Sequence, residues 1–108
     1  MNIEKLIDSV IQWGRDRNII GGASALDQQK KLEEEVAELR TALEANDGKE
    51  TIDAIGDATV VLIMQASILG VRFEDCLAEA YEVIKHRKGK LVDGVYYKEE
   101  DFAKYGIS

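Results

Sequence analysis

Apolar residues recur every three or four positions along most of the chain, a spacing typical of amphipathic helices. The first helix is expected over residues 2–17. Its apolar positions are Ile3, Leu6, Ile7, Val10 and Ile11. Paired glycines in residues 18–23 (NIIGGA) predict a flexible turn. The second helix is expected to start near a cap at Ser24 or Asp27 and to run to about residue 45. One apolar stripe should follow it, formed by Leu32, Val36, Leu39 and Leu43.

The third expected helix, about residues 50–69, is the most hydrophobic element of the chain. It is apolar on nearly every side from Ala54 onward, which predicts a central, buried helix. The turn signal Asn46-Asp47-Gly48 lies just before it, so the second and third helices should form an antiparallel hairpin. Gly56 lies in mid-helix at a cost of about 1 kcal/mol relative to alanine, and close helix approach is the usual reason for such a glycine.

A fourth helix is expected over residues 71–88, followed by a short β-hairpin. Its apolar side would be formed by Phe73, Leu77, Ala80, Tyr81 and Ile84. Residues 91–97 read as two short strands joined by the two-residue turn Asp93-Gly94, and the tail can hold one helical turn around Phe102. The sequence has no proline, no internal repeat and no low-complexity linker. We therefore expect one all-α domain, residues 1–108, built as a four-helix bundle with a C-terminal β-hairpin.

Composition limits the classes of function. Of the 108 residues, 45% are hydrophobic and 32% charged, ordinary values for a folded soluble protein. The net charge of −7 argues against a general nucleic-acid binder, which needs a basic face. The single cysteine, Cys76, excludes an internal disulfide framework and is expected to be a packed, reduced thiol. The only histidine, His86, lies in a basic run, which argues against a histidine-based zinc site or a catalytic triad.

The location of the protein is predicted from the same composition. No basic-then-apolar leader opens the chain, and no apolar run is expected to reach membrane-spanning length. A cytoplasmic protein with no membrane partner is the resulting expectation.

The strongest chemical signal is the acidic segment of residues 31–39 (KLEEEVAEL). Glu34, Glu35 and Glu38 share one broad helix face, where like charges repel unless a cation offsets them. Asp57 is the second half of the signal, because it is an acid inside an otherwise apolar helix, with Asp53 four residues before it. An ionised carboxylate is strongly disfavoured in an apolar interior without a partner.

These acids predict a divalent-metal site built by two helices. Carboxylates with retained water suit magnesium or manganese, whereas zinc would be expected to recruit histidine or cysteine. Two alternatives stay open at this point. The acidic run can be a solvated helix face, as Glu33 is expected to be, and Asp57 can be neutralised by Lys31 or Arg40.

The motif that carries a family resemblance is formed by these acids. Residues 34–38 (EEVAE) match the EExxE pattern of the MazG-like, all-α nucleoside triphosphate pyrophosphohydrolase superfamily, and residues 54–57 (AIGD) match its ExxD pattern at the aspartate. Ala54 stands where that pattern has a glutamate, and Asp53 can partly substitute for it. The opening QWGRDRNII and the closing YEVIKHRKGKLVDGVYYKE extend the match over nearly the whole chain, which resembles the short single-domain members found in bacteriophages.

The resemblance implies hydrolysis of a nucleoside triphosphate to the monophosphate and pyrophosphate. It makes Glu35, Glu38 and Asp57 ligands of Mg²⁺ (with Mn²⁺ as a possible substitute) and Asp53 an auxiliary ligand. Glu34 would orient or deprotonate the attacking water. Lys85, Arg87 and Lys88 are proposed to contact the triphosphate, with surface solubility as the alternative role. Trp13 is proposed to stack on the base, with core packing as the alternative role. The chain has Glu82 where family members often have an asparagine.

Three classes of function remain to be separated. The first is a metal-dependent nucleotide pyrophosphohydrolase, the second a catalytically weakened relative that binds nucleotides, and the third a helical interaction module whose acids contact a basic partner. The apolar third helix of so small a chain, together with the resemblance, favours a homodimer or homotetramer formed through the helices.

Overall fold

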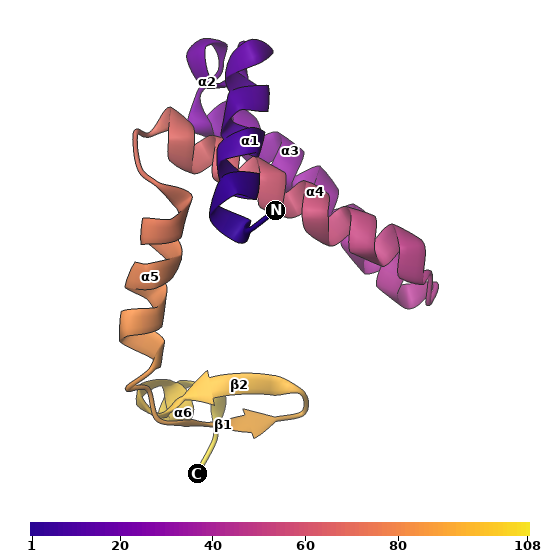
Figure 1. Cartoon of the computed structure of the whole chain (residues 1–108). Coiled ribbons are helices and arrows are strands. Elements are labelled where there is room, and N and C mark those ends of the chain that lie inside the picture. The colour runs from indigo at the N-terminus through magenta and orange to yellow at the C-terminus, as the bar shows by residue number, and fades with distance from the viewer. The chain divides into compact units, whose positions relative to one another are not determined.

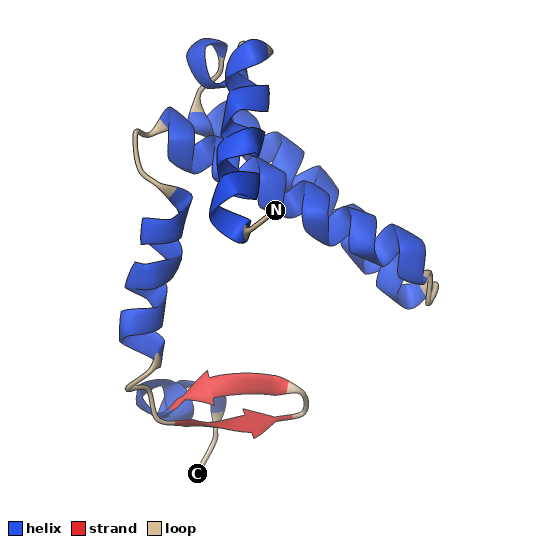
Figure 2. Ribbon diagram, in the orientation of Figure 1, coloured by secondary structure: helices blue, strands red, loops and turns tan.

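The computed structural model describes all 108 residues and is mostly helical, with one two-stranded antiparallel sheet near the C-terminus (Figures 1 and 2). Its elements are α1 (Ile3–Asp16), α2 (Ile19–Gly22), α3 (Ala25–Glu44), α4 (Gly48–Ile68), α5 (Phe73–Ile84), β1 (Gly89–Val92), β2 (Val95–Lys98), η1 (Glu99–Asp101) and α6 (Phe102–Tyr105). The predicted fold class is thereby confirmed. The chain divides into two compact units, residues 1–76 and 77–108.

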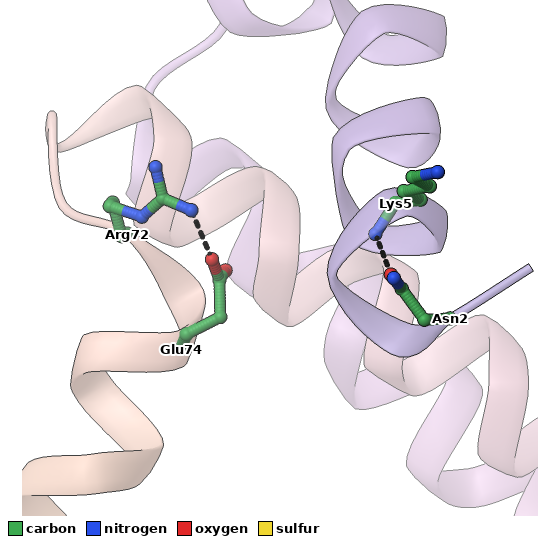
Figure 3. Close-up of polar contacts among 4 residues, drawn as sticks. All are labelled: Asn2, Lys5, Arg72 and Glu74. Atoms are coloured by element: carbon green, nitrogen blue, oxygen red, sulfur yellow. Dashed lines mark hydrogen bonds and ion pairs between the residues drawn. The ribbon is translucent and has the colours of Figure 1, made fainter.

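Side chains fix the first residue of each long helix in the N-terminal unit. The Asn2 side chain accepts a hydrogen bond from the Lys5 backbone at 2.8 Å and caps α1 (Figure 3). Ser24 and Asp27 form a reciprocal capping box at the start of α3, with both hydrogen bonds 2.9 Å long. Asp47 caps α4 by accepting from the Glu50 backbone. The prediction of a cap at Ser24 is confirmed.

Residues 19–22 form a short helix instead of the expected flexible turn. Asn18 takes the left-handed conformation (φ 58°), which lets the chain reverse after α1. Its carbonyl then accepts a hydrogen bond from Gly22. Ile19 and Ile20 pack against the apolar core, so burial of two isoleucines offsets the flexibility that the glycines bring.

The core of this unit is formed where α1 crosses α4 (Figure 1). Its buried centre consists of Ile7, Ile63 and Met64, and Met64 is only 1% exposed. Half-buried neighbours complete it, namely Val10, Ile11, Ile19, Ile20 and Phe73. Along the rest of its length α4 packs beside α3, and this helix pair is the scaffold for the acidic residues.

The expectation that α4 is the central helix is confirmed, because five of the seven buried apolar residues lie on it, namely Ala54, Val61, Ile63, Met64 and Ala66. The helix is not buried on every side, however, since Ile52 and Ile55 remain 76% and 53% exposed. A chain this short has too few helices to surround α4, which packs mainly against α1, α2 and α3.

By length and composition alone α4 is also apolar enough to cross a membrane, as core helices of soluble proteins often are. The expectation that no apolar run reaches this length is therefore wrong.

The buried face of α3 differs from the predicted stripe. Val36 and Leu43 are exposed, whereas the residues directly before them, Glu35 and Ala42, are buried. The helix is therefore rotated by about one residue relative to the expectation. This rotation places a carboxylate, Glu35, on the face that packs against α4.

Gly56 and Gly14 provide a matched test of packing. A Cβ added at Gly56 would meet no atom within 4 Å, so the interpretation of Gly56 as a site of close helix approach is wrong. Gly56→Ala is expected to raise the free energy of unfolding by about 0.5–1 kcal/mol, because alanine restricts the unfolded chain and favours the helix. Urea denaturation followed by circular dichroism measures this.

Gly14→Ala should have the opposite effect. The added Cβ would overlap the sulfur of the fully buried Met64 and lie 3.3 Å from Ile20 Cδ1. Overpacking of this kind typically costs about 1–3 kcal/mol. Equal stability changes for the two variants would contradict the packing described for α1.

Helix α5 starts beside an ion pair between Arg72 and Glu74, drawn in Figure 3. It ends at Ile84, earlier than predicted, so the basic residues 85–88 lie outside the helix. Cys76 is exposed, in contrast to the packed thiol that was expected.

The C-terminal unit contains the predicted hairpin. Strands β1 and β2 pair antiparallel around Asp93 and Gly94, which both have positive φ (49° and 81°), as a two-residue hairpin turn requires. The predicted helical turn at Phe102 corresponds to α6, whose Tyr105 ring lies 4.9 Å from that of Tyr97.

Candidate functional site

Glu35 is the central residue of the acidic cluster, defined here as Glu34, Glu35, Glu38, Asp53 and Asp57. It lies on α3 and is only 4% exposed, the one buried charged residue of the chain. Its Oε2 atom is enclosed and has no hydrogen-bond partner. An enclosed carboxylate oxygen without a donor is costly, so this atom marks a position suited to a cation or a polar ligand.

Lys31 partly neutralises the cluster. Its Nζ lies 3.2 Å from Glu35 Oε1 and 3.5 Å from Glu34 Oε2. The hydrogen bond and the charge of Glu35, with that of Glu34, raise the pKa of the Lys31 ammonium. The alternative that Arg40 neutralises Asp57 is not supported by its contact, because Arg40 pairs with Glu44 at 3.6 Å.

The remaining acids repel one another across the α3–α4 interface. The close approach of the Glu35 carboxylate, and then its charge, raise the pKa of the Glu38 carboxyl. Burial, followed by the charges of Asp53 and Glu35, raises the pKa of the Asp57 carboxyl. Raised pKa values of neighbouring carboxyls show that negative charge accumulates here beyond what Lys31 balances.

The predicted site residues are brought together to different degrees. Glu35, Glu38 and Asp57 are close enough to influence one another electrostatically, and Asp53 lies beside Asp57. The side chain of Glu34 is 65% exposed and points its charge to Lys31. Ala54, where the family pattern has a glutamate, is 3% exposed.

The side chains of the acidic cluster are of the chemical type that binds a hard divalent cation. They supply oxygen donors, and Glu35 supplies an unpartnered one. No group of three or more histidine, cysteine, aspartate or glutamate side chains surrounds a common point in the structure. Binding of an ion by several of them would therefore require side-chain rotation, with Lys31 the nearest obstacle.

Trp13 lies beside the acidic cluster. A cavity of about 420 Å³ is lined by Trp13, Ile19, Gln28, Lys31, Glu35, Asp57, Val60 and Val61. The Trp13 ring is 41% exposed, and Arg17 Cζ lies 4.8 Å from its centroid. An aromatic ring that is partly exposed at a cavity wall can stack on a planar ligand. The interpretation of Trp13 as a pure core residue does not fit this exposure.

The three cations expected to contact phosphate belong to the C-terminal unit. Lys85 pairs with Glu82 at 2.7 Å. Arg87 and Lys88 line a second cavity, of about 530 Å³, together with Val83, His86, Lys98, Glu99 and Glu100.

Two polar residues of the Trp13 cavity were not predicted as functional. Gln28 lines it, and Lys31 both lines it and holds Glu35. The four-residue spacing of Lys31 and Glu35 is a recognisable ion-pair signal, although spacing alone does not show that Glu35 is buried. Gln28 has no such signal in the sequence, because its place in the cavity wall depends on how α1 crosses α4.

The family model described as phosphoribosyl-ATP pyrophosphohydrolase (PRA-PH) matches residues 22–82, more than half of the chain. The chain belongs to this family, which is part of the MazG-like all-α NTP pyrophosphohydrolase superfamily. The whole acidic cluster lies within the matched residues, whereas Trp13 and residues 85–88 lie outside them.

One curated relative is similar to part of the chain. An uncharacterized 18.2 kDa protein in the rep-hol intergenic region of Haemophilus phage HP1 is 34% identical over 65 residues. The alignment covers 60% of this chain and 40% of the phage protein, so the chain spans less than half of that relative. No solved structure matches the chain.

Proposed function

We propose that the chain is a metal-dependent nucleoside triphosphate pyrophosphohydrolase. Water would attack the α-phosphorus of a (d)NTP, the bond between that phosphorus and the α–β bridging oxygen would break, and pyrophosphate would leave with (d)NMP as the other product. The observation that carries the proposal is Glu35, a buried carboxylate with an unpartnered oxygen inside the family-matched segment.

The ligands of the ion would come from both helices. Glu35, Glu38 and Asp57 would hold Mg²⁺, or Mn²⁺ in its place, with Asp53 as an auxiliary ligand. A bound ion of this kind supplies charge neutralisation to the phosphates and lowers the pKa of a coordinated water. The raised pKa values of Glu38 and Asp57 support this assignment, because a dication would relieve the repulsion that raises them.

The other residues would position the reactants. Glu34, which is exposed and close to the buried Glu35, would accept a proton from the attacking water or orient it. Trp13 would stack on the base from the wall of the cavity that also contains Asp57 and Glu35. Lys85, Arg87 and Lys88 would contact the triphosphate, and two of them line a cavity with a further cation, Lys98.

The assembly and location belong to the same proposal. Exposed apolar side chains on α3 and α4 favour a homodimer or a homotetramer formed through these helices, with Val36, Leu43, Ile52, Ile55 and Leu62 as the residues to be covered. Sedimentation equilibrium of the full chain would test it, and a monomer at micromolar concentration would contradict it. We place the protein in the cytoplasm, with a small-molecule substrate and neither nucleic acid nor membrane as partner.

The experiment that tests the activity is a nucleotide screen. Pyrophosphate release from a panel of ribo- and deoxyribonucleoside triphosphates would be followed with Mg²⁺, with Mn²⁺ and with EDTA. Metal-dependent release of pyrophosphate from at least one nucleotide is expected. Tight nucleotide binding without turnover would instead identify a weakened relative, and neither binding nor turnover would leave a helical interaction module.

A further inference from the structure

Lys31 contacts Glu35, the most deeply buried acid of the acidic cluster. Its ammonium contacts Glu35 Oε1 at 3.2 Å, and the Glu35 side chain is 5% exposed. The same ammonium reaches Glu34 at 3.5 Å. One monovalent group thus serves two of the five acids, and it lines the cavity that contains Trp13 and Asp57.

The Glu35 carboxylate already contacts one cation. Its Oε1 is taken by Lys31, and its Oε2 is enclosed without a partner. A divalent ion bound to Glu35 would lie within a few ångströms of the Lys31 ammonium, and two cations at that separation repel strongly in a partly buried site. Lys31 and a metal ion therefore compete for the same carboxylate.

Lys31 is able to move. Its side chain is 54% exposed and is anchored only by these two acids, which lie three and four residues along the same helix. A lysine has a flexible four-carbon stem, so its ammonium can reach solvent without any change in the backbone. The charge of the ammonium also offsets a small part of the rise in the pKa of Glu38 and of Asp57, so it acts beyond the two acids that it contacts.

We propose that Lys31 is an exchangeable counter-ion that holds Glu35 and Glu34 in the metal-free protein and must leave Glu35 before a divalent cation binds. This inference rests on the proposed metal site. It gives a physical reason why no three acids surround a common point, since the cluster is arranged around an ammonium contact. Lys31 is thus a positioning residue that sets the affinity for metal by competition.

The test measures metal binding without turnover. Free Mn²⁺ gives an electron paramagnetic resonance signal that disappears on binding, so a titration of the full chain without nucleotide yields the Kd. Lys31→Met is expected to lower the Kd for Mn²⁺ about threefold to tenfold, the equivalent of losing a modest ion pair to Glu35. Lys31→Arg keeps the charge and is expected to stay within about twofold of the wild type.

Lys30→Met is the matched control. Lys30 precedes Lys31 on α3, carries the same charge, is exposed and forms no ion pair. Lys30→Met changes the net charge by the same amount as Lys31→Met. It therefore measures how much the affinity for Mn²⁺ rises from the change in net charge alone. Tighter Mn²⁺ binding in Lys31→Met than in Lys30→Met supports the exchange.

Three other results would overturn it. If Lys31→Met and Lys30→Met bind Mn²⁺ more tightly by the same factor, the gain comes from long-range charge. The proposed exchange is then wrong, while the proposed metal site stands. If Lys31→Met weakens binding, Lys31 supports the metal-bound state instead of competing with it. If the wild type binds no Mn²⁺, the proposed metal site fails and the exchange fails with it.

Discussion

Glu35→Gln is expected to reduce Mg²⁺-dependent pyrophosphate release by about 1,000-fold. A metal ion contributes several kcal/mol to stabilisation of a phosphoryl-transfer transition state, and each 1.36 kcal/mol corresponds to a factor of ten in rate. Glutamine has nearly the same shape as glutamate, so the buried position of residue 35 stays filled. The measurement is initial rate at saturating Mg²⁺ with the nucleotide that the wild type cleaves fastest.

Glu33→Gln is the control for this variant. Glu33 lies on the same helix, is exposed and has no ion pair, so its removal lowers the negative charge without touching the cluster. Its rate should stay within about twofold of the wild type, in line with the weak energetics of exposed charges. A Glu35→Gln enzyme as active as Glu33→Gln would show that the buried carboxylate has no part in the reaction. Thermal unfolding of both variants in EDTA verifies that each is folded.

Ala54→Glu should destabilise the metal-free protein by about 2 kcal/mol, the typical cost of placing a polar group in a buried position without a partner. Ala54 is 3% exposed and is three residues before Asp57, which already lies among other acids. A fifth carboxylate beside Glu35, Glu38, Asp53 and Asp57 adds repulsion to the burial cost. Urea denaturation in EDTA measures the change.

Mg²⁺ should raise the free energy of unfolding more in Ala54→Glu than in the wild type. The added carboxylate completes the pattern of the family and supplies another oxygen ligand, so binding of the ion to the folded state is strengthened. Ala54→Gln is the control, because it has the same bulk without the charge and should show no extra gain with Mg²⁺. If Ala54→Glu were as stable as the wild type in EDTA, position 54 would be more open than its exposure indicates.

The helices and the hairpin could be predicted because their signals are local. The capping residue Ser24, the turn at Asn46-Asp47-Gly48 and the hairpin turn at Asp93-Gly94 each act within a few residues. The burial of each helix face could not be predicted equally well. The apolar stripe through Val36 and Leu43 was one residue away from the buried face, because packing against α4 decides the rotation of α3.

The acidic cluster, too, could be predicted in its local features and not in its burial. The spacing of Glu34, Glu35 and Glu38 identified a shared face, and the isolated Asp57 identified the partner helix. The four-residue spacing on α3 also brings Lys31 to Glu35. That Glu35 alone is buried depends on how α3 packs against α4. Sequence spacing contains no information of that kind. The short helix α2 was missed for a similar reason, since Ile19 and Ile20 gain their stability from residues on α1 and α4.

Helix α5 has a consequence for the dynamics of the chain. It has only twelve residues, none of them buried, and its apolar side chains Leu77, Tyr81, Val83 and Ile84 are more than half exposed. A helix of this length is marginal in water without tertiary packing. Amide hydrogens of α5 should therefore exchange with deuterium much faster than those of α3 and α4 in a dilute monomer. Protection of α5 that increases with protein concentration would reveal that a second copy covers it.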